Sequence, residues 1–195
     1  MIKEMSMWRI LFRNNNVRTL NQAMATGKVR YVVNLSETLH DHRYAEIANE
    51  IAARPGVKLV LIAGPSSSGK TTSSKRLALH MRVNGLNPII ISLDDYFRNR
   101  VDTPLDENGE YDFECLEALD VPFLNEQLEQ LLAGQRVEIP KYDFTSGTRK
   151  FEGQFLQLTE NDVLIMEGIH GLNPGLTPQI PTEEKFRLYV SVLTP

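Results

Sequence analysis

The sequence predicts an α/β fold: a P-loop-type parallel sheet with helices on both faces, preceded by a small, mainly helical segment. Short apolar runs recur along the chain, separated by stretches with helical spacing. Each run is apolar nearly throughout instead of alternating, which is typical of strands buried on both faces. The Pro55-Gly56 pair predicts a boundary between an N-terminal extension or linker, residues 1–56, and the main domain, residues 57–195.

The first apolar run, Val57–Ala63, leads directly into a glycine-rich loop of the form G-x-x-x-x-G-K-[ST]. A helical pattern over 72–83 follows, and Gly85 closes it. Strand, loop and helix in this order favour a phosphate-binding loop over a chance Gly/Ser turn. We expect these residues to contact nucleotide phosphates: Gly64, Ser66, Ser67, Ser68, Gly69, Lys70, Thr71 and Thr72.

The other elements follow from periodicity and capping signals. In the N-terminal segment we expect helices within Met1–Phe12, over 19–25 and from an N-cap at Ser36 to Ala53, with a strand-like stretch over 29–33. In the main domain we expect strands over 88–93, 137–139, 151–158, 163–166 and 186–193, a helix from Asp120 to Gly134, and a long loop over 98–115. The strands at 137–139 and 151–158 are candidates for a hairpin.

Acidic residues follow two of the buried strands. Asp94-Asp95 comes after the second strand, and Glu167 comes after the strand over 163–166. Because ligands bind at the carboxyl ends of strands in such sheets, these side chains should face the phosphate-binding loop. We expect Asp94 to act as the catalytic base and to lie near Mg²⁺, Glu167 and Thr71 to hold that metal, and Lys70 to neutralise the phosphates. The alternative roles are turn formation, which we assign to Asp95, and helix capping.

Aromatic residues gather in the loops beside the same edge: Tyr96, Phe97, Tyr111, Phe113, Tyr142 and Phe144. A flat acceptor such as a nucleobase would suit these stacking surfaces. The alternative is that some of them pin long loops to the core.

Composition narrows the class of protein. The formal net charge of −4 argues against a nucleic-acid-coating role, and the single cysteine provides no disulfide framework or thiolate metal cluster, which fits the cytoplasm. The sequence also lacks an apolar run long enough for a membrane helix. We therefore expect a small-molecule substrate and no membrane partner. A homo-oligomer stays open.

Five segments in this order resemble the uridine kinase/phosphoribulokinase family, and their spacing is most similar to uridine–cytidine kinases. They are Gly64–Thr71, SLDDYF at 92–97, YDF at 111–113, IPKYDFTSGTRK at 139–150 and LIMEGIHG at 164–171. The resemblance covers about residues 57–195. It implies a kinase that uses ATP or GTP with Mg²⁺ and phosphorylates a nucleoside 5′-hydroxyl, with Asp94 as the base.

The resemblance also implies an acceptor site. Phe113, Tyr142 and Phe144 would flank the base, Glu114 would bind the ribose hydroxyls, and Arg149 would lie at the substrate. Three positions depart from the family pattern. Gly147 stands where pyrimidine kinases have a histidine that reads the base edge, Phe97 replaces a tyrosine, and Glu114 replaces an aspartate. These departures put pyrimidine selectivity in question more than kinase chemistry.

The family continues with a lid helix that carries phosphate-clamping arginines, and none follows Pro195. We therefore expect the lid to come from further chain or from elsewhere. Residues 1–56 resemble the linker of longer bacterial proteins in which a threonyl-tRNA-synthetase-like region precedes a uridine-kinase-like domain.

Two other functions stay open. One is a kinase for another small hydroxyl compound, such as ribulose 5-phosphate or pantothenate; a phosphorylated acceptor would need cations such as Arg98, Arg100, Arg149 and Lys150. The other is a nucleotide-binding regulatory module without turnover.

Overall fold

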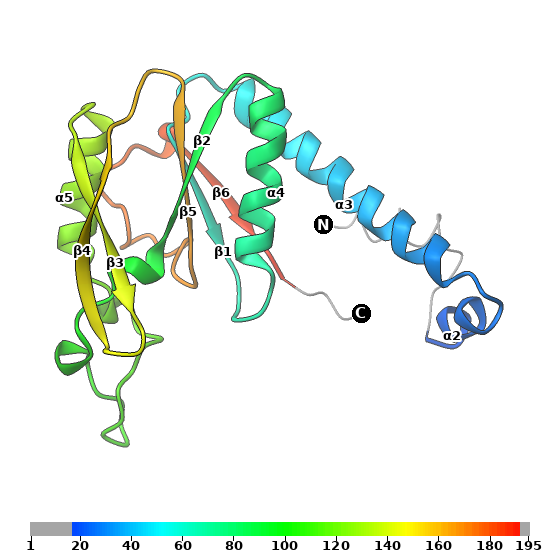
Figure 1. Cartoon of the computed structure of the whole chain (residues 1–195), viewed down its shortest axis with the longest axis horizontal. Helices are drawn as coiled ribbons and strands as arrows, with labels where there is room; N and C mark the ends of the chain where they lie inside the picture. Colours follow the sequence, from blue (N-terminus) through cyan, green and yellow to red (C-terminus); the bar gives the residue numbers. More distant parts are fainter. Residues whose placement is uncertain (1–16, 192–195) are drawn as a thin grey trace. The chain divides into compact units, whose positions relative to one another are not determined.

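The computed structural model describes residues 17–191 (Figure 1). The chain forms two compact units, residues 1–46 and residues 47–195, and the division falls within helix α3, Val29–Ala52. The boundary at Pro55-Gly56 stays a prediction. None of the helices within 17–191 is long and apolar enough to cross a membrane.

Within the described residues, two helices precede the sheet. Helix α2, Val17–Ala25, confirms the expected short helix, and Gly27 follows it with a left-handed φ of 76°. The strand expected over 29–33 is wrong because these residues form the start of α3. The N-cap expected at Ser36 is also wrong, since its hydroxyl donates to the Val32 carbonyl inside the helix. The helix expected within Met1–Phe12 lies outside the described residues.

Four parallel strands form the main sheet: β1, Leu59–Ala63; β2, Asn87–Ser92; β5, Asp162–Glu167; and β6, Lys185–Tyr189. Their order is β2-β5-β1-β6. Every residue of the central strands β1 and β5 is buried, whereas the edge strands β2 and β6 are buried only in part. The apolar runs thus correctly predicted a parallel sheet. The expectation of full burial holds for β1 and β5, whereas the strands expected over 88–93 and 186–193 correspond to the edge strands β2 and β6 and are buried only in part.

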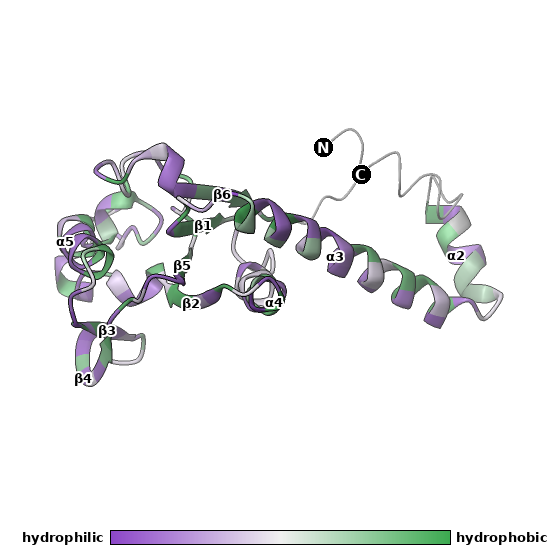
Figure 2. Cartoon of the chain, turned by 90° about the horizontal axis from the view of Figure 1, so that it is seen from above, coloured by the Kyte–Doolittle hydropathy of each residue, from purple (hydrophilic) through white to green (hydrophobic). Residues whose placement is uncertain are grey.

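Helices cover the two faces of this sheet, as predicted (Figure 2). Helix α4, Lys70–Val83, buries Leu77 and Met81. Helix α5, Val121–Leu132, packs on the other face, where Leu124, Leu128 and Leu131 join a core cluster with Leu59, Leu61, Leu164 and Met166. Asp120 caps α5 by accepting a hydrogen bond from the Phe123 N–H.

A two-stranded antiparallel sheet lies beside α5 (Figure 1). Strands β3, Val137–Asp143, and β4, Thr148–Leu156, confirm the expected hairpin, and β3 is longer than the predicted 137–139. The register shifts between Glu138 and Pro140, which accommodates a proline without an N–H donor.

Short 3₁₀ turns complete the main domain: η1, Leu93–Tyr96; η2, Arg100–Asp102; η3, Leu116–Ala118; and η4, Thr182–Glu184. The segment over 98–115 is otherwise irregular, with one bridge between Leu105 and Tyr111, as the sequence predicts for a long loop.

Candidate active site

Strand register brings the expected site residues to one edge of the sheet. Glu167 on β5 lies level with Ile62 on β1 and with Ser92 on β2. The glycine-rich loop leaves β1 two residues beyond Ile62, and Asp94 follows β2 two residues beyond Ser92. Residues more than a hundred positions apart along the chain therefore meet because parallel strands end together.

The glycine-rich loop has the backbone of an anion-binding site. Ser67 and Gly69 adopt left-handed φ values of 59° and 90°, and α4 begins immediately afterwards at Lys70, two residues earlier than expected. Successive turns of this kind direct backbone N–H groups toward one point at the helix N-terminus. The Lys70 ammonium donates to the Pro65 carbonyl at 3.0 Å, so it lies folded over the loop.

Gly64 tolerates no side chain. A Cβ atom there would lie 2.7 Å from Ser68 Oγ and far inside the contact distance of the Val190 carbonyl oxygen. The Ser68 hydroxyl is itself buried and has no hydrogen-bond partner among residues 17–191. A buried polar group of this kind, inside a cradle of N–H groups, is consistent with an anionic ligand.

Thr71 and Glu167 contact each other across the site. The Thr71 hydroxyl donates to Glu167 Oε1 at 2.7 Å, and Glu167 is buried. Hydroxyl and carboxylate oxygens fit Mg²⁺, which commonly takes one or two carboxylates and completes its shell with phosphate and water. No cluster of three or more His, Cys, Asp or Glu side chains suited to a metal occurs within 17–191. These two residues thus fit a metal shared with a nucleotide.

Asp94 lies at the same edge. Loss of solvent around its carboxyl raises the pKa of Asp94 above the usual range, the Glu167 carboxylate adds to this rise, and the Lys70 ammonium opposes it. The N–H of Asp94 donates to Ser92 Oγ, which caps η1. A carboxylate whose charged form is disfavoured is a suitable proton acceptor for a hydroxyl.

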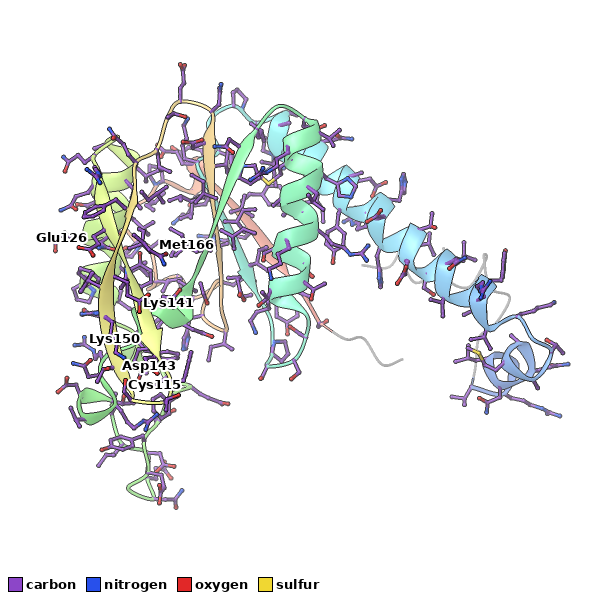
Figure 3. All side chains as sticks on the ribbon, in the orientation of Figure 1. Cys115, Glu126, Lys141, Asp143, Lys150 and Met166 are labelled. Carbon is purple, nitrogen blue, oxygen red and sulfur yellow. The ribbon has the colours of Figure 1, made fainter. Side chains whose placement is uncertain are left out.

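Asp95 does more than form a turn. Its buried carboxylate accepts hydrogen bonds from Lys141 Nζ at 3.0 Å and from the Tyr142 N–H at 3.2 Å. The sequence interpretation, which assigned Asp95 to the turn alone, is corrected in this respect. These bonds join η1 to β3 of the hairpin, on which Lys141 is labelled in Figure 3. Asp95 therefore fixes the hairpin next to Asp94.

Four aromatic side chains form one cluster beside this edge. Phe97 packs against Phe113, Tyr142 and Phe144, with ring centroids 5.9, 5.6 and 6.4 Å apart. Phe144 is 59% exposed, so the cluster presents a ring to solvent. Tyr96 behaves as the alternative predicted, because it is buried in the core and donates to Gln127.

The remaining predicted acceptor residues differ in their surroundings. Glu114 is exposed and adjoins Phe113 in sequence. The Arg149 guanidinium pairs with Asp120 at 2.9 Å and lies over the Phe123 ring, so it is held at the N-terminus of α5. Its Nη1 is buried without a partner among the described residues. The substrate roles of Glu114 and Arg149 stay predictions.

Sequence reasoning missed the arrangement around Gly147. The Arg100 N–H donates to the Gly147 carbonyl at 2.8 Å, and Arg100 Nη2 donates to the Phe144 carbonyl at 2.7 Å. Arg100 precedes Gly147 by 47 positions, and no spacing rule links the two.

Comparison with known proteins agrees with this geometry. Residues 59–174 match the Phosphoribulokinase / Uridine kinase family. A uridine kinase from Lactobacillus helveticus is 35% identical over 115 residues, which cover 57% of this chain and 51% of the relative. A uridine kinase from Bacillus cereus is 37% identical over 108 residues, with 55% and 49% covered. This chain thus spans about half the length of these curated relatives.

A solved structure described as a possible uridine kinase from Bacillus stearothermophilus is also similar. It has a TM-score of 0.54 and 25% sequence identity, with 68% of this chain and 70% of that chain covered. The family match extends from β1 past Glu167, so it includes the glycine-rich loop, Asp94 and the hairpin. The chain belongs to the Phosphoribulokinase / Uridine kinase family.

Proposed function

We propose that this chain is the catalytic part of a nucleoside kinase of the uridine type, which transfers the γ-phosphate of ATP or GTP to a 5′-hydroxyl. One observation carries the proposal: a single sheet edge holds the glycine-rich loop, the Thr71–Glu167 pair and Asp94, with an aromatic cluster beside it. The uridine kinases among the relatives support the choice of acceptor.

The proposed roles follow from the chemistry of each group. The loop amides and Lys70 bind the phosphates, and Asp94 accepts the proton of the attacking hydroxyl. Thr71 and Glu167 would hold Mg²⁺, which neutralises phosphate charge when bound. Phe113, Tyr142 and Phe144 flank the base, Glu114 binds the ribose hydroxyls, and Arg149 contributes a cation on the acceptor side.

A nucleoside panel with ATP and Mg²⁺ tests this proposal on the full chain. We expect uridine to be phosphorylated, and Asp94→Asn to reduce kcat by about 10²-fold or more with little change in ATP affinity, because the base acts only in the chemical step. The matched variant Asp102→Asn, in the exposed turn η2, should keep the wild-type rate. ATP binding without phosphorylation of any nucleoside would contradict the proposal.

A second candidate is a kinase for a small phosphorylated hydroxyl compound. The Arg100 guanidinium favours it, because a cation beside the aromatic cluster could also bind a phosphate. Turnover of ribulose 5-phosphate, with nucleosides inert, would establish this candidate instead.

A further inference from the structure

Arg100 occupies the space that a side chain at position 147 would need. A Cβ atom built on Gly147 would lie 2.8 Å from Arg100 Cβ and 2.9 Å from both Cζ and Nε of Arg100. Gly147 also has a left-handed φ of 67°, which favours glycine. The turn between β3 and β4 is therefore built around the arginine.

Two hydrogen bonds, one from its backbone and one from its guanidinium, hold Arg100 at the turn. The backbone of Arg100 is bonded to Gly147, and its Nη2 is bonded to the Phe144 carbonyl. A guanidinium has five N–H donors, and this bond uses one of them. The other donors form no hydrogen bond with residues 17–191, so a ligand beside the turn could accept from them.

Tyr142 provides a second polar group at the same place. Its side chain is only 4% exposed, and its hydroxyl has no hydrogen-bond partner among residues 17–191. Arg100 and Tyr142 both contact Phe144, Arg100 through the Phe144 carbonyl and Tyr142 through the Phe144 ring. Burial raises the pKa of Tyr142, and the charge of Arg100 opposes that rise. A buried hydroxyl without a partner indicates a ligand atom as the partner.

Aromatic rings pack against Tyr142, one of these two polar groups. The Tyr142 ring lies 5.6 Å from Phe97 and 5.0 Å from Phe144, measured between centroids, and both contacts are edge-on. The combination of rings and two hydrogen-bonding groups fits a flat ligand whose edge meets Arg100 and Tyr142.

We propose that Arg100, together with Tyr142, reads the edge of the acceptor base and selects an oxo group over an amino group, and hence uridine over cytidine. This inference rests on the proposed nucleoside kinase function. A guanidinium can only donate hydrogen bonds. The 4-oxo group of uracil accepts from Arg100, whereas the 4-amino group of cytosine would face the Arg100 donors and leave the guanidinium unpaired. The Tyr142 hydroxyl donates and accepts, so it bonds either group and the discrimination comes from Arg100.

The test compares kcat/KM for uridine and cytidine with the full chain, ATP and Mg²⁺. The wild type should prefer uridine by about 10²-fold or more, as expected where a hydrogen-bonding group is the discriminator. Arg100→Gln, whose amide can donate and accept, should lower that ratio by about tenfold. Arg100→Lys, which only donates, should keep the preference. Arg136→Gln is the matched control because this exposed arginine lies over Phe155 on the hairpin.

The ratio of kcat/KM for uridine to that for cytidine distinguishes recognition of the base by Arg100 from structural support of the turn. If Arg100 only supports the turn, Arg100→Gln lowers both values equally and the ratio stays constant, which overturns the inference. Equal use of both nucleosides by the wild type also overturns it and leaves the kinase proposal standing. Phosphorylation of no nucleoside at all defeats both.

A second variant covers the case in which Arg100→Gln fails to bind ATP. Gly147→Ala adds the Cβ that displaces the guanidinium, so it should lower the uridine preference in the same direction. An unchanged ratio in this variant, with ATP binding intact, would also contradict the proposed role of Arg100.

Discussion

At the scale of single residues, the position of Asp94, the proposed base, carries an energetic cost. Its pKa is raised above the ordinary value of 3.8, mainly by loss of solvent and then by the Glu167 carboxylate. At pH values above the raised pKa, the Asp94 carboxylate is charged in both states, and this charge is less favourable in the folded state, so it lowers the free energy of unfolding. Below pH 3.8 the carboxyl is protonated in both states and this cost disappears.

We therefore expect Asp94→Asn to raise the melting temperature at pH 8 while it lowers kcat. The gain should shrink as the pH falls through the raised pKa and vanish below about pH 3.8, where Asp and Asn are both neutral. Thermal unfolding of both proteins across this pH range, without Mg²⁺, measures the effect. A gain that persists at low pH would show that charge is not its cause.

The position of a single residue could be predicted from the sequence where the residue directly follows a recognisable strand. Asp94 and Glu167 could be placed from sequence because each follows a strand that is recognisable by itself. Gln127 could not, since its buried amide bonds the Tyr96 hydroxyl and the Glu138 carbonyl, which come from two other elements. Arg100 was named only as a cation for a phosphorylated acceptor, and its position at Gly147 is a tertiary contact that no local pattern encodes.

At the scale of elements, the hairpin of β3 and β4 depends on one tie to η1. Asp95→Ala removes the acceptor of Lys141 Nζ and of the Tyr142 N–H. We expect faster hydrogen exchange in β3 and a higher KM for the nucleoside, because the aromatic cluster is no longer fixed beside Asp94.

The KM for ATP serves as the internal control for Asp95→Ala. The glycine-rich loop connects β1 to α4 and is not part of the hairpin, so ATP binding should not change. If the KM for ATP rises as much as that for the nucleoside, the hairpin is not an independent acceptor module.

The secondary structure of segments with a continuous apolar pattern could be predicted from the sequence. That of an isolated β-branched run could not. β1 and β5 are buried along their whole lengths, and their sequences allow little else. The run at 29–33 has the composition of a strand but exposes Val29, Tyr31 and Val33 on α3. No strand within residues 17–191 pairs with this segment, so helical hydrogen bonding inside it prevails over intrinsic β-propensity.

At the scale of the whole molecule, the proposed nucleotide site depends on how β6 closes the sheet. The Val190 N–H donates to the Ala63 carbonyl, and the Val190 carbonyl packs against Gly64. We expect Gly64→Ala to destabilise the fold by about 1–3 kcal/mol, as overpacking does, and to abolish ATP binding.

Thermal unfolding and ATP titration measure these two effects. Gly56→Ala is the control, because a Cβ there meets no atom within 4 Å, and it should leave both quantities unchanged. Wild-type ATP affinity in Gly64→Ala would show that the contact with Val190 is not needed.

The closure by β6 has a consequence for synthesis on the ribosome. β1 pairs with β5 and β6, which follow it by about a hundred residues or more in the sequence. During translation β1 therefore has no neighbouring strand until the intervening chain has been synthesised. The phosphate cradle is encoded early but is completed only when Val190 leaves the exit tunnel. ATP capture by stalled nascent chains of increasing length would therefore report the moment at which the sheet closes.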